Sequence, residues 1–193
     1  MKIFIDGSAG TTGLRIKDRL MKRSDVELTT LSEEQRKDTE SRKQALNSAQ
    51  VAFLCLPDAA AVEAVELVEN PDTVIIDTST AHRTSEGWAY GFPELSAEFE
   101  DKIKNSKRIA VPGCHAGGFI ALVYPLVEAG VLGNDALLSC YSLTGYSGGG
   151  KKMIAEYESE NKSPLLFAPR QYGLTQQHKH LKAMKGITGI KNA

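Results

Sequence analysis

The sequence predicts an α/β protein whose first half forms a parallel β-sheet. Two observations predict this fold class. Short continuous apolar runs alternate with segments of helical spacing, and a glycine-rich loop directly follows the first run. Continuous apolar strands separated by helices are typical of a parallel sheet that is covered on both faces.

The first half contains five expected strands and three expected helices. The strands are expected at residues 2–6, 26–31, 51–56, 73–77 and 108–111. The helices are expected at residues 11–22, 59–69 and, after a polar loop, within 33–48. Pro57 ends the third strand because proline cannot donate a hydrogen bond to a sheet. Val62, Val65 and Val68 share one face of the helix that follows.

The second half changes character and indicates part of an α+β domain. An apolar helix is expected at residues 117–130, a strand at 136–147 and a helix at 151–160. The tail, residues 185–193, has the pattern of a chain that approaches a further strand. We place the domain boundary near Cys114, which gives domains of residues 1–113 and 114–193.

Composition excludes several classes of protein. The chain has 193 residues, and its 23 basic and 24 acidic side chains nearly cancel. No field of one sign therefore favours nucleic acid or an anionic membrane as a partner. No apolar run reaches the roughly 18 residues of a transmembrane helix, and the N-terminus lacks the pattern of a signal peptide. We expect a cytoplasmic protein.

The cysteines and histidines do not indicate a disulfide framework or a metal site. Cys55, Cys114 and Cys140 are odd in number and widely spaced. Cys55 and Cys140 lie in strand-like apolar runs, so we expect both to be buried as small hydrophobic side chains. His178 and His180 have a spacing that metal ligands use, but no cluster of carboxylates or thiols accompanies them. We therefore expect no metal.

The loop after the first strand has the pattern G-x-x-G-x-x-G, formed by Gly7, Gly10 and Gly13. Such glycines let the backbone turn tightly and approach a diphosphate, which the N–H groups and dipole of the next helix attract. The pattern predicts a Rossmann-like nucleotide-binding domain. Further hydroxyl contacts are expected from Ser8, Thr11 and Thr12. The alternative is a plain turn between a strand and a helix.

The tip of the second strand bears on which nicotinamide cofactor binds. An acid there would favour NAD, because it would bind the free ribose hydroxyls. The chain instead has Ser32, with Arg36 and Lys37 nearby. A serine beside cations suits a 2′-phosphate, so Ser32 and Arg36 are candidate ligands of NADP(H). The alternative is that both cations are solvated.

Cys114 follows an expected strand and opens an expected helix. The positive end of a helix dipole favours the thiolate, which is the nucleophilic form. The carboxyl end of a sheet strand is also where open α/β folds bind ligands. Cys114 is thus a candidate nucleophile, and the alternative is a helix-start cysteine without chemistry. His178 and His180 are its candidate acid–base partners, whereas His115 is expected to point away.

These motifs resemble those of the semialdehyde dehydrogenase superfamily, and within it most closely the shorter form of the N-acetyl-γ-glutamyl-phosphate reductases. They occur in the family's order across nearly the whole chain. Besides the glycine loop, they are Asp77-Thr78-Ser79-Thr80-Ala81-His82-Arg83, Tyr90-Gly91-Phe92-Pro93-Glu94, Pro112-Gly113-Cys114, Gly145-Tyr146-Ser147-Gly148-Gly149-Gly150-Lys151-Lys152 and His178-Lys179-His180.

The resemblance implies an enzyme of arginine biosynthesis that reduces N-acetyl-γ-glutamyl phosphate, a small acyl phosphate, with NADPH. It implies that Cys114 attacks the acyl group to form a thioester and that His180, or else His178, is the acid–base group. The implied substrate-binding residues are Ser79, Arg83, Ser147, Gly148 and Gly149. The alternative for residues 77–83 is an ordinary loop at a strand end. We also expect a homo-oligomer.

Two features depart from the family's pattern. Ala183 stands where the family has an acid in H-x-H-x-x-E, so the imidazole lacks its carboxylate partner. Family chains also continue well beyond this length. We therefore expect this chain either to be poorly stable alone or to associate through the exposed edge of an incomplete sheet.

Two other functions remain open. One is a related reductase that acts on another acyl phosphate, such as aspartyl phosphate, with the same cysteine and glycine loop. The other is a nucleotide-binding module without catalysis.

Overall fold

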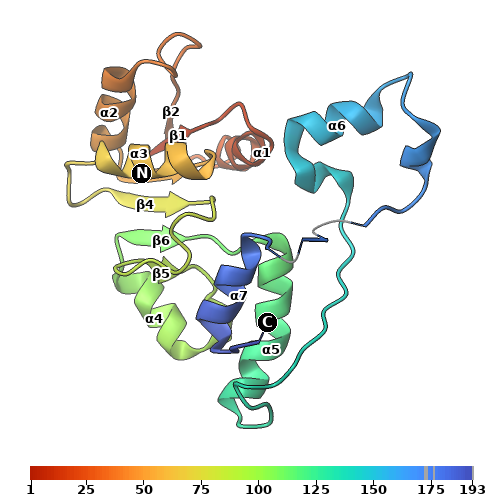
Figure 1. The fold of residues 1–193 in the computed structure, drawn as a ribbon. Coiled ribbons are helices and arrows are strands. Elements are labelled where there is room, and N and C mark those ends of the chain that lie inside the picture. The colour runs from red at the N-terminus through yellow and green to blue at the C-terminus, as the bar shows by residue number, and fades with distance from the viewer. Residues whose placement is uncertain (172–173, 176, 193) are drawn as a thin grey trace.

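The computed structural model describes residues 1–171, 174–175 and 177–192, with only the backbone described at Thr11. Its core is a six-stranded sheet in the order β2-β1-β3-β4-β6-β5 (Figure 1). Every neighbouring pair of strands is parallel. The strands are β1 (Lys2–Asp6), β2 (Glu27–Thr29), β3 (Val51–Leu54), β4 (Val74–Asp77), β5 (Ala89–Tyr90) and β6 (Arg108–Ala110). The α/β fold class is confirmed.

Helices connect the strands and make up most of the second half. The α-helices are α1 (Thr11–Leu20), α2 (Thr39–Ser48), α3 (Asp58–Glu66), α4 (Ala97–Asn105), α5 (Cys114–Glu128), α6 (Gly150–Glu158) and α7 (His180–Thr188). Three short 3₁₀ helices are η1 (Pro93–Leu95), η2 (Tyr146–Gly149) and η3 (Pro164–Phe167). No helix of the described residues is both long enough and apolar enough to cross a bilayer.

Five strands of the sheet were predicted from the sequence, whereas β5 and α4 were missed. Strand β5 has two residues, which is too few to show a periodicity. Helix α4 begins at a polar stretch, where the Ser96 hydroxyl accepts a hydrogen bond from the N–H of Phe99 at 3.5 Å. A serine before an amphipathic segment is a helix-start signal that could have identified α4.

The first hydrophobic cluster lies between the sheet and helices α2 and α3. Its buried residues are Phe4, Ala45, Leu46, Ala49, Ala52, Leu54, Ala64 and Ile75. The buried face of α3 carries Ala61 and Ala64, and Val62 is 42% exposed. Small side chains let a helix approach the sheet closely, so the alanines rather than the row of valines face the core.

The second cluster lies at the β5–β6 end of the sheet, where α4, α5 and α7 gather (Figure 1). Phe119 and Ile120 of α5 pack there with Ala183 and Met184 of α7. Within the tail, residues 185–188 belong to α7, and the further strand expected after the tail stays a prediction. Ile187 of α7 and Ile190 beyond its end pack in the second cluster with α5, and Gly189 ends the helix in the left-handed conformation with φ of +74°.

The expected strand at residues 136–147 does not form in the described structure. Residues 135–145 carry no strand assignment, and Leu137, Tyr141 and Leu143 are 86%, 88% and 81% exposed. This stretch leads from the end of α5 to α6, which stands apart from the sheet (Figure 1). Cys140 is consequently exposed, contrary to expectation. A strand needs a hydrogen-bonded neighbour, and none of the described residues supplies one.

Candidate functional site

Several loops meet at the carboxyl edge of the sheet. Strands β1, β3, β4 and β6 run parallel, so the segments that follow them emerge at the same edge. These segments are residues 7–10, 55–57, 78–88 and 111–113. The chain passes from β1 to β2 on one side and returns to β3 on the other, and open α/β sheets bind ligands at such a reversal.

The glycine loop after β1 can hold a diphosphate because side chains would not fit in it. A Cβ on Gly7, whose φ is +81°, would lie 2.8 Å from the carbonyl carbon of Cys55, and one on Gly13 would lie 2.8 Å from the Cα of Ser8. The N–H of Gly10 donates to the carbonyl of Gly7 at 2.9 Å, which closes the turn. No described side chain caps α1, so its first N–H groups remain open to an anion.

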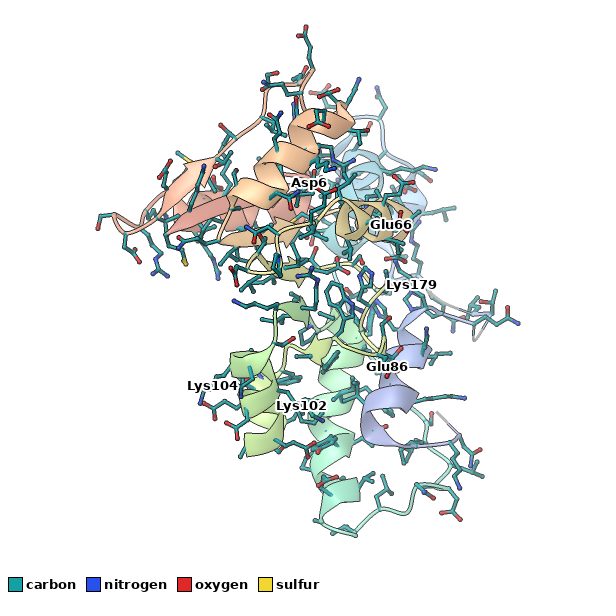
Figure 2. All side chains as sticks on the ribbon, turned by 90° about the vertical axis from the view of Figure 1, so that its left-hand side faces the viewer. Asp6, Glu66, Glu86, Lys102, Lys104 and Lys179 are labelled. Carbon is teal, nitrogen blue, oxygen red and sulfur yellow. The ribbon has the colours of Figure 1, made fainter. Side chains whose placement is uncertain are left out.

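The predicted hydroxyl ligands flank this loop. Ser8 is half-buried and Thr12 is exposed. The side chain of Thr11 lies outside the described residues. Beneath the loop, Asp6 at the end of β1 is 4% exposed and accepts two hydrogen bonds from the guanidinium of Arg42, at 2.8 and 3.0 Å. This buried pair joins α2 to β1, and Figure 2 shows Asp6 within the sheet-bearing part of the molecule. The sequence analysis did not identify it.

The candidate 2′-phosphate ligands follow β2. The Ser32 hydroxyl accepts a hydrogen bond from the N–H of Gln35 at 3.3 Å. Arg36 pairs with the exposed Glu33 at 2.9 Å, and its Nε is buried without a partner among the described residues. Both residues lie in the segment that follows β2, which ends at Thr29. The assignment of the 2′-phosphate to them remains a prediction.

Cys114 is exposed at the first residue of α5, and residues 111–113 connect it to the end of β6. The guanidinium of Arg83 lies immediately behind it, because Gly113 has no side chain: a Cβ there would lie 2.9 Å from Cζ of Arg83. Arg83 is 7% exposed and donates from Nε to the carbonyl of Val111 at 2.9 Å. Its Nη1 has no hydrogen-bond partner among the described residues. A buried cation with an unused donor therefore faces the surroundings of the candidate nucleophile.

The loop after β4, which carries Arg83, is held by hydrogen bonds to Asp77 and by a ring stack. Asp77, at 0% exposure, accepts hydrogen bonds from the hydroxyl of Ser79 at 2.6 Å and from Nδ1 of His82 at 2.7 Å. The ring of His82 stacks on Trp88 with centroids 4.1 Å apart. Ser79 is thus held by Asp77, and its role as a substrate ligand remains a prediction. Asp77, His82 and Trp88 position the loop, which the sequence analysis did not foresee.

The predicted acid–base histidines lie beside the start of α5. The ring of His180 is 4.4 Å from that of His178 and 6.0 Å from that of His115, centroid to centroid. His115 is the next residue after Cys114, and its Nδ1 is 2.7 Å from the hydroxyl of Ser142. The expectation that the side chain of His115 points away from Cys114 stays a prediction, while the ring of His115 lies near that of His180. Packing of α7 on α5 brings the three rings together although the chain separates them.

His180 is a neutral imidazole at pH 7. Burial is the main reason that the pKa of His180 falls to about 4, and electrostatic interactions with His178 and the guanidinium of Arg83 lower it further. Burial also lowers the pKa of His178. A neutral imidazole can accept a proton. Nδ1 of His180 is buried without a partner among the described residues. Ala183, one turn further along α7, offers no carboxylate to this nitrogen. The unpaired Nδ1 of His180 is therefore what the structure shows where the acid of H-x-H-x-x-E is replaced by Ala183.

The other predicted site residues are less closely tied to this cluster. Ser147, Gly148 and Gly149 form exposed backbone in η2, next to α6, and their contact with substrate remains a prediction. Cys55 is half-buried, and burial raises its pKa to about 11, which keeps the sulfur protonated. The described residues contain no group of three or more histidine, cysteine or acidic side chains placed to hold a metal ion.

Two family models match the chain. The NAD-binding domain of the semialdehyde dehydrogenases matches residues 2–105, and their dimerisation domain matches residues 114–191. A solved aspartate semialdehyde dehydrogenase from Francisella tularensis superposes with a TM-score of 0.61 at 16% identity, over 96% of this chain and 55% of that one. This likeness shows the fold.

Curated relatives are similar over most of the chain. N-acetyl-gamma-glutamyl-phosphate reductase from Chelativorans sp. (strain BNC1) is 51% identical over 184 residues, which are 95% of this chain and 59% of the relative. The protein of the same name from Mesorhizobium japonicum is 48% identical over 99% of this chain and 61% of its own length. The chain thus spans about three fifths of these relatives. Since one family model covers more than half of it, the chain belongs to the semialdehyde dehydrogenase family.

Proposed function

We propose that this chain carries the cofactor-binding and nucleophilic residues of an NADPH-dependent N-acetyl-γ-glutamyl-phosphate reductase of arginine biosynthesis. The observation that carries the proposal is the grouping of an exposed Cys114 at a helix start, the buried guanidinium of Arg83 and the neutral imidazole of His180. The names of the relatives, at 48–51% identity, support this substrate.

In the proposed reaction, the sulfur of Cys114 attacks the acyl carbon, a C–S bond forms, and the bond to the phosphate oxygen breaks. The open N–H groups at the start of α5 stabilise charge on the acyl oxygen. Nη1 of Arg83 holds an anionic oxygen of the substrate. His180 accepts the thiol proton and returns it to the acyl oxygen as the thioester is reduced to a thiohemiacetal. The C–S bond of this adduct then breaks, the hydroxyl proton passes through His180 back to the sulfur, and the aldehyde leaves. NADPH, when bound along the glycine loop, supplies the hydride for that reduction.

The residues proposed to hold the cofactor are Gly7, Ser8, Gly10, Thr11, Thr12 and Gly13 at the diphosphate and Ser32 and Arg36 at the 2′-phosphate. We propose a boundary between a cofactor domain, residues 1–113, and a catalytic portion, residues 114–193. The match of residues 114–191 to a dimerisation domain supports a homo-oligomer that forms through that portion. A cytoplasmic location is proposed with the biosynthetic role.

The test is the substitution Cys114→Ser in the full-length protein. The assay follows phosphate-dependent NADPH formation from N-acetylglutamate semialdehyde, which is the reverse reaction. We expect kcat to fall by about a thousandfold or more, because the covalent step is lost. Affinity for NADPH, measured by fluorescence, should stay unchanged.

Two results would contradict the proposal. Turnover of aspartate semialdehyde in preference to the acetylated substrate would assign the chain to the related reductase. Cofactor binding without turnover of either semialdehyde, in both the parent protein and the serine variant, would assign it to a non-catalytic module.

A further inference from the structure

One carboxylate, that of Asp58, joins three segments of the carboxyl edge. Asp58 is the first residue of α3. It accepts hydrogen bonds from the N–H of Thr80 at 2.8 Å and from the Thr80 hydroxyl at 2.6 Å. Nζ of Lys179 lies 3.2 Å from the same carboxylate, although it is 121 residues away in the chain. Burial opposes the charge, but the bonds from Thr80 and Lys179 lower the pKa of Asp58 below its usual value, so the group is a carboxylate at pH 7.

Lys179 stands between the two candidate acid–base histidines, His178 and His180. It is the residue before α7. Its own side chain makes no capping hydrogen bond, and the N–H of His180 donates to Nδ1 of His178 at 3.3 Å. From His180 onward, α7 is held by buried Ala183 and Met184 against α5. The Lys179–Asp58 pair therefore joins the start of this helix to the start of α3, which follows β3. In Figure 2, Lys179 lies where the sheet-bearing part of the molecule meets the α5–α7 part.

The segment that carries Asp58 also borders the glycine loop. Residues 55–58 connect β3 to α3. A Cβ on Gly7 would lie 2.8 Å from the carbonyl carbon of Cys55 and 3.1 Å from Cδ2 of Leu56. This short connection thus has the cofactor loop on one side and the histidine segment on the other.

We propose that Asp58 and Lys179 form a clamp, an ion pair that fixes the ring of His180 beside the start of α5 and at a set position relative to the cofactor loop. The inference rests on the function proposed above. Both are positioning residues, because they act through His180 and not on the reacting atoms. Thr80 orients the carboxylate from the loop that also carries Arg83, so one carboxylate aligns the acid–base histidine with the candidate anion-binding arginine.

The test compares Lys179→Met with Lys102→Met in the full-length protein. Lys102 makes a similar exposed pair with Glu98 on α4, at 2.6 Å, away from the histidines. We expect Lys179→Met to lower kcat about tenfold, since a small misplacement of a catalytic group has effects of this order or larger. The KM for NADPH and the melting temperature should not change. Lys102→Met should match the parent protein, and Lys179→Arg, which keeps the charge, should restore most of kcat.

Asp58→Asn adds a second arm, because asparagine can keep the bonds to Thr80 while it removes the charge. If the pair acts as a unit, the double variant Asp58→Asn/Lys179→Met should be no slower than the slower single variant. A parent-like kcat for Lys179→Met, or effects that multiply in the double variant, would overturn the clamp.

A readout without substrate separates this inference from the proposed function. Imidazole NMR signals of His178 and His180 should shift in Lys179→Met and not in Lys102→Met. If the parent protein shows no turnover while these signals shift, the reductase proposal fails and the clamp stands. If the parent turns over and the signals stay in place, the clamp fails alone.

Discussion

Residues 51–54 and residues 136–143 are both short apolar stretches of strand-forming composition, yet only the first is a strand. In β3, Ala52 and Leu54 are 0% exposed, and the strand pairs with β1 and β4. In the second stretch, Leu137 and Leu143 are more than 80% exposed. The difference teaches that composition makes a strand possible, whereas hydrogen-bonded neighbours on the sheet make it form.

The largest expected effect lies in the sheet. Leu54→Ala removes a fully buried side chain from the first cluster, so the free energy of unfolding should fall by about 2–5 kcal/mol. Urea denaturation followed by circular dichroism measures this loss. A loss below about 1 kcal/mol would mean that the sheet core is loosely packed, and the contrast between the two stretches would disappear.

The glycine loop should give the next largest effect. Gly7→Ala forces an alanine into φ of +81° and against the carbonyl group of Cys55, so we expect a loss of about 1–3 kcal/mol and weaker NADPH binding. Gly87→Ala is the matched control, because Gly87 has φ of +77° with no atom within 4 Å of the added Cβ. Equal losses in both variants would show that backbone strain alone matters and that the loop does not approach β3 closely.

Acid should weaken the packing of α7. The pKa of His180 is about 4 in the folded chain and 6.5 ordinarily, so the unfolded chain binds more protons between these values. The free energy of unfolding should therefore fall as the pH drops from about 6.5 to 4. His180→Gln should reduce this fall, as measured by urea denaturation at several pH values. Identical pH profiles for both proteins would place His180 in solvent.

The smallest effect is expected in the second stretch. Leu143→Ala makes the same chemical change as Leu54→Ala at an 81% exposed position, and it should change the free energy of unfolding by no more than about 0.5 kcal/mol. A loss that matches Leu54→Ala would show that this stretch is buried in solution. Sedimentation at several concentrations would then test whether a second copy covers it.

The elements predicted most accurately are those whose signal is local. Strands β1 and β3 were located to within two residues at each end, because apolar runs bounded by Gly7 or Pro57 are visible in the sequence itself. The helical conformation of residues 185–188 was not predicted. Ile187 and Ile190 of the tail pack in the hydrophobic cluster that α5 and α7 share. These two helices are far apart in the sequence, so the contact has no local signal.

The candidate site was predicted in part. The glycines and Cys114 could be identified from their places next to strands. Lys179 lies between two residues already singled out, and Asp58 is an acid shortly after a strand end, so a search for charged residues at the sheet edge could have paired them. No pattern in the sequence indicated that the rings of His115 and His180 would lie near each other.

The sequence by itself located the five apolar segments that became strands, the tight loop at Gly7 and the place of Cys114 at a helix start, because each signal lies in residues that are adjacent in the chain. Only the tertiary structure decided that Arg83 lies behind Gly113, that His180 is buried as a neutral base and that Asp58 meets Lys179. The physical reason is that these contacts form where parallel strands end together and where α7 packs back on α5. Composition and periodicity do not specify which distant segments meet at such an edge.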